Sequence, residues 1–162
     1  MPEISEAQTQ EQLQQVRTLF REYHSELPKQ LKLANFDREV EGLPGEYSPP
    51  KGSLLLATVA GQPAGCVGLR PFPRLEGACE MKRLYVRPAF RSYGLGRKLI
   101  DAVIHAARDA GYAALRLDTL ASMEAAQRLY RELGFVEIPA YNNSHLPGTR
   151  FYELALDAHT PT

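Results

Sequence analysis

The stretch Arg87–Gly111, RPAFRSYGLGRKLIDAVIHAARDAG, joins a turn with two glycines to a long helical pattern. Apolar residues recur in it at steps of four: Leu95, Leu99, Val103 and Ala107. This spacing predicts an amphipathic helix from about Leu95 to Ala110, which ends at Gly111. Gly94, Gly96 and several basic residues therefore lie at the start of a helix.

The start of this helix is a predicted anion site. The first N–H groups of a helix have no partner within the helix and carry a partial positive charge, so they attract phosphate. Arg97 and Lys98 fall in the first turn, where cations cost roughly a few tenths of a kcal/mol unless an anion offsets them. Gly94 and Gly96 let the backbone approach a ligand closely, and Arg91 adds a forked donor. On these residues alone, a solvated turn that binds nothing explains the pattern equally well.

Two common phosphate-binding loops do not fit the stretch. A dinucleotide-binding loop needs a third glycine at the position where Leu99 stands. A Walker-type loop needs Ser or Thr directly after Gly-Lys, but Gly96 is followed by Arg97 and Lys98. We therefore expect the anion to be held differently than in dehydrogenases and nucleotide hydrolases.

Two helices and three strands are predicted before this stretch. Apolar spacings of three and four indicate a helix over Gln8–Leu27, and a shorter helix follows around Phe36–Leu43. Apolar runs at Leu54–Ala60 and Ala64–Leu69 flank the turn AGQP and predict a hairpin. The segment ACEMKRLYVRP predicts a third strand, which Pro88 ends.

One more helix and three strands are predicted after it. AALRLDTL is typical of a strand, and the next helix can be capped by Ser122 and ended by Gly134. Phe135–Ile138 and TRFYELAL predict the last two strands. The order is helix, helix, three strands, helix, strand, helix and two strands. It favours an α/β layer structure with helices on both faces of a sheet.

Length and composition narrow the class of protein. A chain of 162 residues is expected to form one domain over residues 1–162. Its 19 basic and 19 acidic residues cancel, which argues against a nucleic-acid or membrane-surface partner. Cys66 and Cys79 lie in apolar runs away from zinc-like spacings, so we expect buried free thiols and no metal site. The chain start has no signal-peptide pattern, which favours a cytoplasmic protein.

Two motifs together resemble a known family. RSYGLG, which follows the strand MKRLYVRPAF and precedes the helix, is similar to the Gln/Arg-x-x-Gly-x-Gly/Ala loop of the GNAT superfamily of acyl-CoA-dependent N-acetyltransferases. SMEAAQRLYRELGFVEI resembles the second signature of that family, a tyrosine-bearing helix that ends in Gly-Phe. The resemblance covers roughly Leu54–Leu156. It implies an α/β (α+β) fold with a mixed, mostly antiparallel central sheet of six to seven strands.

The resemblance implies that acetyl-CoA is the co-substrate and supplies the predicted anion. Its pyrophosphate would lie on the backbone amides of Arg91–Gly96, and its pantetheine arm would run beside the strand at Leu84 and Val86. The implied cofactor-binding residues are Leu84, Tyr85, Val86, Arg91, Ser92, Tyr93, Gly94, Leu95, Gly96, Arg97, Lys98 and Ser122. Many members have asparagine where this chain has Ser122, so a side-chain contact from Ser122 to CoA is not implied.

The resemblance also implies catalytic roles. Tyr130 would protonate the departing thiolate, and the backbone N–H of Leu84 would stabilise the oxyanion. A phenol near pKa 10 donates uphill to a thiolate whose acid is near about 8.5, so Tyr130 needs a lowered pKa or a partner. Glu80 is the predicted base, since it lies four residues before Leu84 and strand alternation puts both on one face. The alternatives are a core role for Tyr130, and an ion pair from Glu80 to Lys82 or Arg83 with water as the base.

The acceptor is expected at the parts of the chain that are least like the family. Residues that can hydrogen-bond it there are Tyr47, Arg70, Tyr141, Asn142 and His145. Glu39, Glu41 and Glu46 could favour a cationic amine. We expect a primary amine on a small-molecule or amino-acid-like acceptor, attacked directly in a ternary complex.

Three other interpretations of the sequence stay open. The chain could be a non-catalytic acyl-CoA-binding module, a protein N-terminal or lysine acetyltransferase, or a peptide- or nucleic-acid-binding domain of the same class. Homodimers are common in the GNAT family, and that analogy is the only argument for one here.

Overall fold

The computed structural model describes residues 2–31, 33, 35–143 and 145–156. Seven strands form one sheet in the order β1-β2-β3-β4-β5-β7-β6. The strands are β1 Pro2–Glu6, β2 Ser53–Val59, β3 Gln62–Pro71, β4 Ala78–Val86, β5 Ala114–Thr119, β6 Val136–Ile138 and β7 Arg150–Ala155. The α-helices are α1 Gln10–Glu26, α2 Phe36–Glu41, α3 Leu95–Asp109 and α4 Glu124–Glu132, and the 3₁₀ helices are η1 Gly45–Tyr47 and η2 Pro88–Tyr93.

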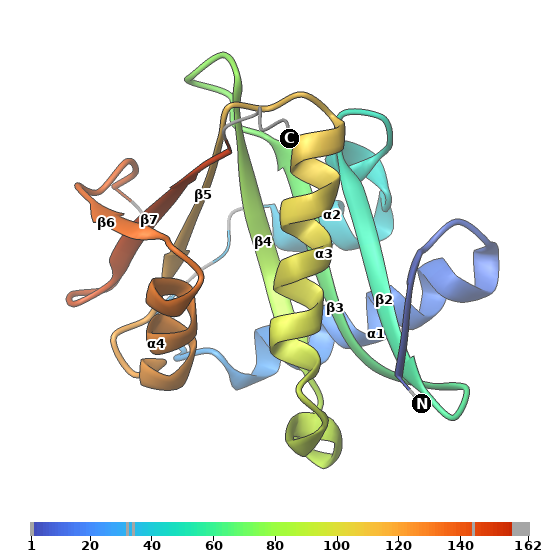
Figure 1. The fold of residues 1–162 in the computed structure, drawn as a ribbon. Helices are drawn as coiled ribbons and strands as arrows, with labels where there is room; N and C mark the ends of the chain where they lie inside the picture. The colour runs from blue at the N-terminus through green and yellow to red at the C-terminus, as the bar shows by residue number, and fades with distance from the viewer. Residues whose placement is uncertain (1, 32, 34, 144, 157–162) are drawn as a thin grey trace.

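The sheet is mixed and mostly antiparallel, as the sequence indicates. Every neighbouring pair is antiparallel except β4 and β5, which run parallel. Figure 1 shows α3 crossing one face of the sheet, with α1 and α2 behind it. The predicted fold class is therefore confirmed. No helix in the described ranges is long and apolar enough to cross a membrane.

Each face of the sheet has its own hydrophobic core. On the α3 face, the four residues of the predicted helical stripe are all fully buried: Leu95, Leu99, Val103 and Ala107. Tyr130 of α4 belongs to the same core, so α3 and α4 cover one face. On the other face, Phe20 of α1, Val40 of α2 and Tyr47 of η1 pack against β2 and β3.

The predicted element order omits β1, and this omission is wrong. β1 pairs antiparallel with β2 from Pro2↔Val59 to Glu6↔Leu55 and forms an edge of the sheet. The Glu6 carboxylate accepts from the Ser53 hydroxyl at 2.6 Å and from the Leu54 amide at 2.8 Å, which fixes the end of the strand. A short, polar edge strand carries little of the hydrophobic alternation on which strand prediction depends.

A β-bulge in β4 changes the faces of the sheet that its side chains occupy. Gly68 pairs with Lys82 but Cys66 pairs with Tyr85, so two β4 residues stand opposite one β3 residue. Arg83, inside this bulge, has the positive φ of 63°.

The bulge also corrects the argument that assigned Glu80 as the base. Leu84 packs in the α3-face core, whereas Glu80 bonds to Arg70 on the α1 face. Simple alternation, which predicts that Glu80 and Leu84 share a face, is therefore wrong here, because a bulge adds one residue to the strand.

β4 and β5 diverge soon after they pair. Their parallel ladder holds only from Ala78↔Ala114 to Glu80↔Arg116, and the second half of β4 has no ladder partner on its β5 side. β5 continues instead along β7, from Ala114↔Ala155 to Thr119↔Arg150. The middle of the sheet is thus split where β4 and β5 part.

Gly68 in β3 gives a test of the α1-face core. A Cβ there would come within 2.6 Å of the ring of Tyr47, which is 1% exposed and cannot move aside. We expect Gly68→Ala to lower the free energy of unfolding by about 1–3 kcal/mol through overpacking. Urea unfolding measures it. The control is Gly96→Ala, where a Cβ meets nothing within 4 Å. If the Gly68→Ala variant were as stable as the wild type, the packing of Tyr47 against Gly68 described above would be contradicted.

Candidate active site

Two adjoining cavities lie where β4 and β5 diverge. Their volumes are about 110 Å³ and about 270 Å³. Both are lined by Tyr23, Lys82, Arg83, Asp118, Thr119 and Met123. The two cavities therefore adjoin each other between the two strands, and we call them together the fork passage.

The smaller cavity lies on the α3 and α4 side and contains the predicted acid. Tyr130 lines it and is 4% exposed, with its ring centroid 5.5 Å from that of Phe135 and 5.9 Å from that of Tyr152. Burial raises the pKa of Tyr130, and the Asp118 carboxylate contributes to the rise. The phenol is therefore protonated at neutral pH, but its pKa moves away from that of a thiol. Of the two conditions that the sequence sets for an acid role, a lowered pKa or a partner, the lowered pKa is not found.

The larger cavity lies on the α1 and α2 side. Apolar side chains from the end of α1 and the segment after it, Leu27, Leu31 and Leu33, form one part of its wall. Four of the predicted acceptor residues also line it: Glu39, Arg70, Asn142 and His145. Tyr47, Tyr141, Glu41 and Glu46 are not in its lining, and Glu41 instead pairs with Arg21 on the surface at 3.1 Å.

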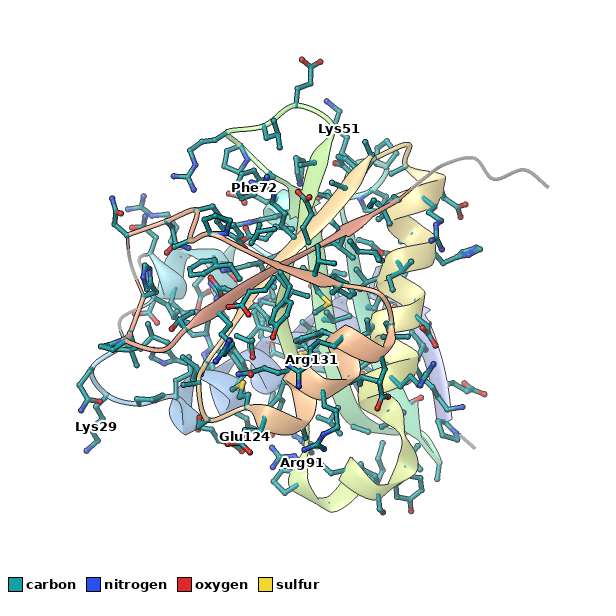
Figure 2. All side chains as sticks on the ribbon, turned by 60° about the vertical axis from the view of Figure 1, so that its left-hand side comes forward. Lys29, Lys51, Phe72, Arg91, Glu124 and Arg131 are labelled. Atoms are coloured by element: carbon teal, nitrogen blue, oxygen red, sulfur yellow. The ribbon has the colours of Figure 1, made fainter. Side chains whose placement is uncertain are left out.

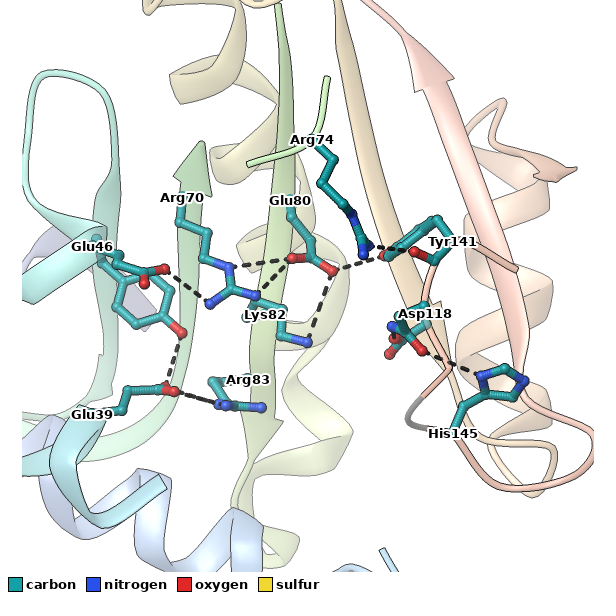
Figure 3. Close-up of polar contacts among 12 residues, drawn as sticks. Glu39, Glu46, Arg70, Arg74, Glu80, Lys82, Arg83, Asp118, Tyr141 and His145 are labelled. Atoms are coloured by element: carbon teal, nitrogen blue, oxygen red, sulfur yellow. Dashed lines mark hydrogen bonds and ion pairs between the residues drawn. The ribbon is translucent and has the colours of Figure 1, made fainter. Parts of the chain in front are cut away.

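Glu80 is the centre of a buried polar network beside this cavity (Figure 3). It is 3% exposed and accepts from Arg70 Nε and Nη2 at 3.2 and 3.0 Å. The Tyr141 hydroxyl donates to its other oxygen at 2.8 Å, and Lys82 Nζ lies 3.8 Å away. The ion pair with Lys82, weighed as the alternative role of Glu80, is thus present. Glu80 does not line either cavity of the fork passage.

Arg83, in the bulge, is held by a second carboxylate (Figure 3). Its Nε and Nη2 donate to Glu39 at 3.0 and 2.8 Å, and the Tyr47 hydroxyl donates to the same carboxylate at 2.9 Å. Burial alone would raise the pKa of Glu39, but the hydrogen bonds and charge of Arg83 outweigh it and the pKa is lowered. Glu39 is therefore ionised and committed to Arg83, and it is not free to attract a cationic amine.

The glycine turn before α3 is open to solvent. Gly94 has the positive φ of 70°, and a Cβ at either Gly94 or Gly96 would meet nothing within 4 Å. No side chain caps α3, and its first turn holds no acidic residue. Because nothing inside the described protein requires the room at Gly96, the open space suits a ligand that approaches the first amides of α3.

The other residues predicted at this turn differ in their exposure. Arg91, Ser92, Tyr93, Arg97 and Lys98 are exposed, whereas Leu95 is fully buried and offers only its backbone. Arg91 donates from Nε to the Val86 carbonyl at 2.9 Å and pairs with Glu26 at 3.1 Å. Figure 2 shows Arg91 at the same end of the molecule as Glu124, the first residue of α4.

Ser122 does not cap α4, so that expectation is wrong. The N-cap residue is Met123, and its side chain makes no capping hydrogen bond. The Met123 amide instead donates to the Leu120 carbonyl at 3.0 Å, and Gln127 Nε2 donates to the same carbonyl at 2.9 Å. This tight turn shifts the helix start past the serine.

The family is decided by comparison with known proteins. The model of the Acetyltransferase (GNAT) family matches residues 13–135. The chain belongs to the GNAT family. An uncharacterised N-acetyltransferase of Schizosaccharomyces pombe is 35% identical to this GNAT chain over 154 residues, which are 94% of each protein.

Two further relatives of this GNAT protein extend the comparison. Human N-acetylaspartate synthetase is 35% identical over 108 residues, which are 63% of this chain and 34% of that protein. The structure of an acetyltransferase from Salmonella typhimurium with its cofactor acetyl-CoA superposes with a TM-score of 0.75 over 99% of this chain and 96% of that one, at 19% identity. The family match makes the protein an N-acetyltransferase that uses acetyl-CoA as co-substrate, and the superposition shows the GNAT-like fold.

Acetyl-CoA brings an activated acetyl thioester, and the residues present suit it. The open turn at Gly94–Gly96 suits the pyrophosphate, and the unpaired second half of β4, at Leu84 and Val86, offers main-chain groups to an extended amide-containing arm. The side chain of Tyr85 points to the opposite face, where its hydroxyl donates to Glu26 at 3.0 Å.

The sequence did not single out Asp118, Thr119, Tyr23 or Met123, although all four line both cavities. A signal existed for Asp118 and Thr119. They end the strand AALRLDTL, and polar residues at the carboxyl end of a strand whose neighbour is parallel lie at the edge where such sheets bind ligands. Tyr23 looked like a core residue of α1, and no local pattern distinguishes it.

Gly96→Ala separates stability from cofactor binding. Because Gly96 lies in the first turn of α3, we expect the alanine variant to be more stable without ligand by about 0.5–1 kcal/mol. Its methyl group would occupy space open to the pyrophosphate, so CoA affinity should fall at least about tenfold. Urea unfolding and calorimetric titration with CoA measure the two effects. Wild-type affinity in the variant would show that CoA does not approach this glycine.

Glu39→Gln tests the buried pair with Arg83. The lowered pKa of Glu39 means that its stabilising effect is complete above its ordinary value of 4.5 and is lost as pH falls through the folded-state value. We expect the variant to lose roughly 3 kcal/mol of unfolding free energy at neutral pH, because Arg83 is left buried without its carboxylate.

The deficit should shrink as the pH is lowered to about 3. Glu41→Gln is the matched control, since its pair with Arg21 is exposed and should be worth less than about 1 kcal/mol. A deficit that is equal at both pH values would contradict the pair.

Proposed function

We propose that the protein transfers the acetyl group of acetyl-CoA to the primary amine of a small, amino-acid-like acceptor by direct attack in a ternary complex. The observation that carries the proposal is the fork passage. It joins a cavity lined by Tyr130 and Leu84 to one lined by α1, Glu39 and Arg70. A donor on one face and an acceptor on the other can meet there without a covalent enzyme intermediate.

The larger cavity favours a small acceptor. Its volume of about 270 Å³ is near the lower end of ligand cavities, and it is walled by the end of α1 and by the loops after β5 and β6. The name of the human relative, N-acetylaspartate synthetase, indicates that a member of this family forms an N-acetylated amino acid. Both points support an acceptor of amino-acid size over a protein tail.

Two groups around the smaller cavity suit the chemistry of the thioester. Tyr130 is protonated and buried beside the β4 edge, so it would donate a proton to the leaving sulfur. The backbone N–H of Leu84, just after the bulge, would donate to the developing oxyanion, and a main-chain donor needs no reorganisation. Glu80, held by Arg70, Lys82 and Tyr141, would keep β3, β4 and the loop after β6 in position.

Tyr130→Phe tests the assigned acid. The variant keeps the ring in the core and loses only the hydroxyl, so we expect wild-type stability and CoA affinity. Its kcat with an amine panel, read as free-thiol release from acetyl-CoA, should fall about 100-fold with a smaller change in KM. Tyr152→Phe, which alters the neighbouring ring in the same core, is the matched control and should retain activity.

The outcomes separate the alternatives. Full activity in Tyr130→Phe would leave the N-acetyltransferase assignment intact and remove the acid role. Tight CoA binding by the wild type without thiol release on any amine would favour the non-catalytic module. Acetylation of peptide amines alone, with no free amino acid turned over, would favour the protein acetyltransferase.

A further inference from the structure

Asp118 presents a carboxylate to the fork passage that no cation neutralises. It lines both cavities from β5. It accepts a long hydrogen bond from Asn142 Nδ2 at 3.4 Å, and no Lys, Arg or His in the described part of the chain lies within ion-pair distance of it. A carboxylate with one neutral donor has lone pairs available for a cationic ligand.

Lys82 presents the opposite charge from β4. Its side chain is 18% exposed and lines both cavities. The nearest carboxylate, Glu80, is 3.8 Å away and already accepts from Arg70 and Tyr141. Within the described ranges the ammonium donates no hydrogen bond. A largely buried ammonium that donates no hydrogen bond and has only a distant carboxylate at 3.8 Å is costly, so the site is suited to an anionic group that reaches Lys82.

The other charges in the passage are matched. Arg83 is paired with Glu39 at 2.8 Å, and Arg70 is paired with Glu80 at 3.0 Å and with Glu46 at 2.9 Å. Figure 3 shows these pairs on the β3 and β4 side, with Lys82 and Asp118 facing the space between β4 and β5. A cation that donates no hydrogen bond to its carboxylate at 3.8 Å, and an anion that pairs with no cation in the described residues, thus line the same cavity from its two opposite strands.

Two buried hydroxyl groups without hydrogen-bond partners in the described residues belong to side chains that line the larger cavity. Thr119 is 5% exposed, and its Oγ1 has no hydrogen-bond partner in the described protein; the same holds for the buried Oγ1 of Thr149. Both residues line the larger cavity. Buried hydroxyls without partners are rare, and a polar ligand group supplies the missing bond.

We propose that the acceptor is a free zwitterionic amino acid, whose ammonium binds Asp118 and whose carboxylate binds Lys82, with the Thr119 and Thr149 hydroxyls donating to or accepting from its polar groups. This inference rests on the proposed function and deepens it. It makes Asp118, which touches the reacting nitrogen, a catalytic residue and Lys82 the residue that selects for a carboxylate.

The proton balance of the reaction gives Asp118 its role. The acceptor nitrogen begins with three protons as an ammonium and ends with one as an amide. Asp118 takes the first proton and passes it to solvent, which frees the lone pair that forms the C–N bond. The second leaves the nitrogen after this bond forms. The C–S bond breaks with its electron pair on sulfur, Tyr130 supplies the proton of the thiol, and the proton released by the nitrogen restores Tyr130.

The geometry favours Asp118 over Glu80 for this step. Glu80 accepts three hydrogen bonds from Arg70 and Tyr141 and lines neither cavity, whereas Asp118 lines both. Asp118 also belongs to the smaller cavity with Tyr130, so the proton acceptor and the proton donor share one site.

The first test compares each proteinogenic amino acid that has a primary α-amine with its own α-carboxamide, which keeps the amine and removes the negative charge. With acetyl-CoA and wild-type protein, we expect at least one amino acid to have a kcat/KM about tenfold or more above that of its carboxamide. Calorimetric titration of the same amino acid into the protein with free CoA provides a readout that does not depend on turnover.

Three variants test which charged residue binds which group of the acceptor. Lys82→Met should raise KM for the preferred amino acid at least about tenfold and leave its carboxamide within about twofold, so the preference is lost. Lys82→Arg should restore the preference. Asp118→Asn should lower kcat about 100-fold for both compounds. The controls are Lys51→Met and Asp109→Asn, which remove exposed charges outside the passage and should change neither. Circular dichroism checks that each variant is folded.

The possible results distinguish failure of this inference from failure of the proposed function on which it rests. Equal turnover of amino acids and carboxamides, unchanged by Lys82→Met, would overturn the inference and leave the N-acetyltransferase intact. Absence of turnover on every amine, with amino-acid binding that Lys82→Met abolishes, would support the zwitterion site and overturn the proposed function. Neither turnover nor binding would overturn both.

Discussion

The divergence of β4 from β5 is the constraint on which the site depends. Three residue pairs hold the two parallel strands together, and β5 then follows β7 while β4 continues alone. The separation does two things at once. It leaves the second half of β4 without a ladder partner on one side, which suits an extended ligand. It also leaves room between β4 and β5 for the two cavities of the fork passage. The bulge at Arg83 contributes to the same site, because it adds Arg83 to the lining of the fork passage and places Leu84 in the α3-face core.

The sequence predicted the helices and the central strands well because their apolar spacing is strong, and α3 begins and ends within a residue of the prediction. It also predicted the glycine turn and the tyrosine helix, because both are local motifs. It failed where non-local contacts decide. β1 is a strand because β2 offers an edge, and Ser122 lies outside α4 because the turn closes on Leu120. The prediction that Glu80 and Leu84 share a face was wrong, because the residues around Arg83 carry no sequence pattern that indicates a bulge. Asp118 lines the site because β4 and β5 diverge beside it, and no local sequence pattern indicates that divergence.

The charged residues around the fork passage form two groups. The first holds the strands in position and consists of the scaffold pairs, Glu80–Arg70 and Glu39–Arg83; the second, Lys82 and Asp118, is the one that we propose binds the acceptor. Glu80 with Arg70, and Glu39 with Arg83, are buried pairs joined by further donors from Tyr141 and Tyr47. Such pairs contribute little net stability, but the removal of one partner leaves a buried charge and is costly, so they fix the position of the strands that carry them. Lys82 lies 3.8 Å from Glu80 without a hydrogen bond to it, and Asp118 pairs with no cation in the described residues. A small cavity that holds one positive and one negative side chain needs its other charged neighbours to be paired with each other. The two scaffold pairs meet that condition, because Arg70 and Arg83 each bind a glutamate.

The position of the acceptor relative to the cofactor is set by α1. Near its end this helix contacts the segment before α3 through ion pairs of Glu22 with Arg87 at 2.7 Å and of Glu26 with Arg91 at 3.1 Å. The hydrogen bond from Arg87 lowers the pKa of Glu22, so the first pair is ionised at neutral pH. The same end of α1 places Tyr23 and Leu27 in the lining of the larger cavity. One rigid helix therefore contacts the glycine turn on one side and the acceptor cavity on the other. Because a small error in the distance between reacting groups is expensive in rate, a direct connection of this kind is what transfer in a ternary complex requires.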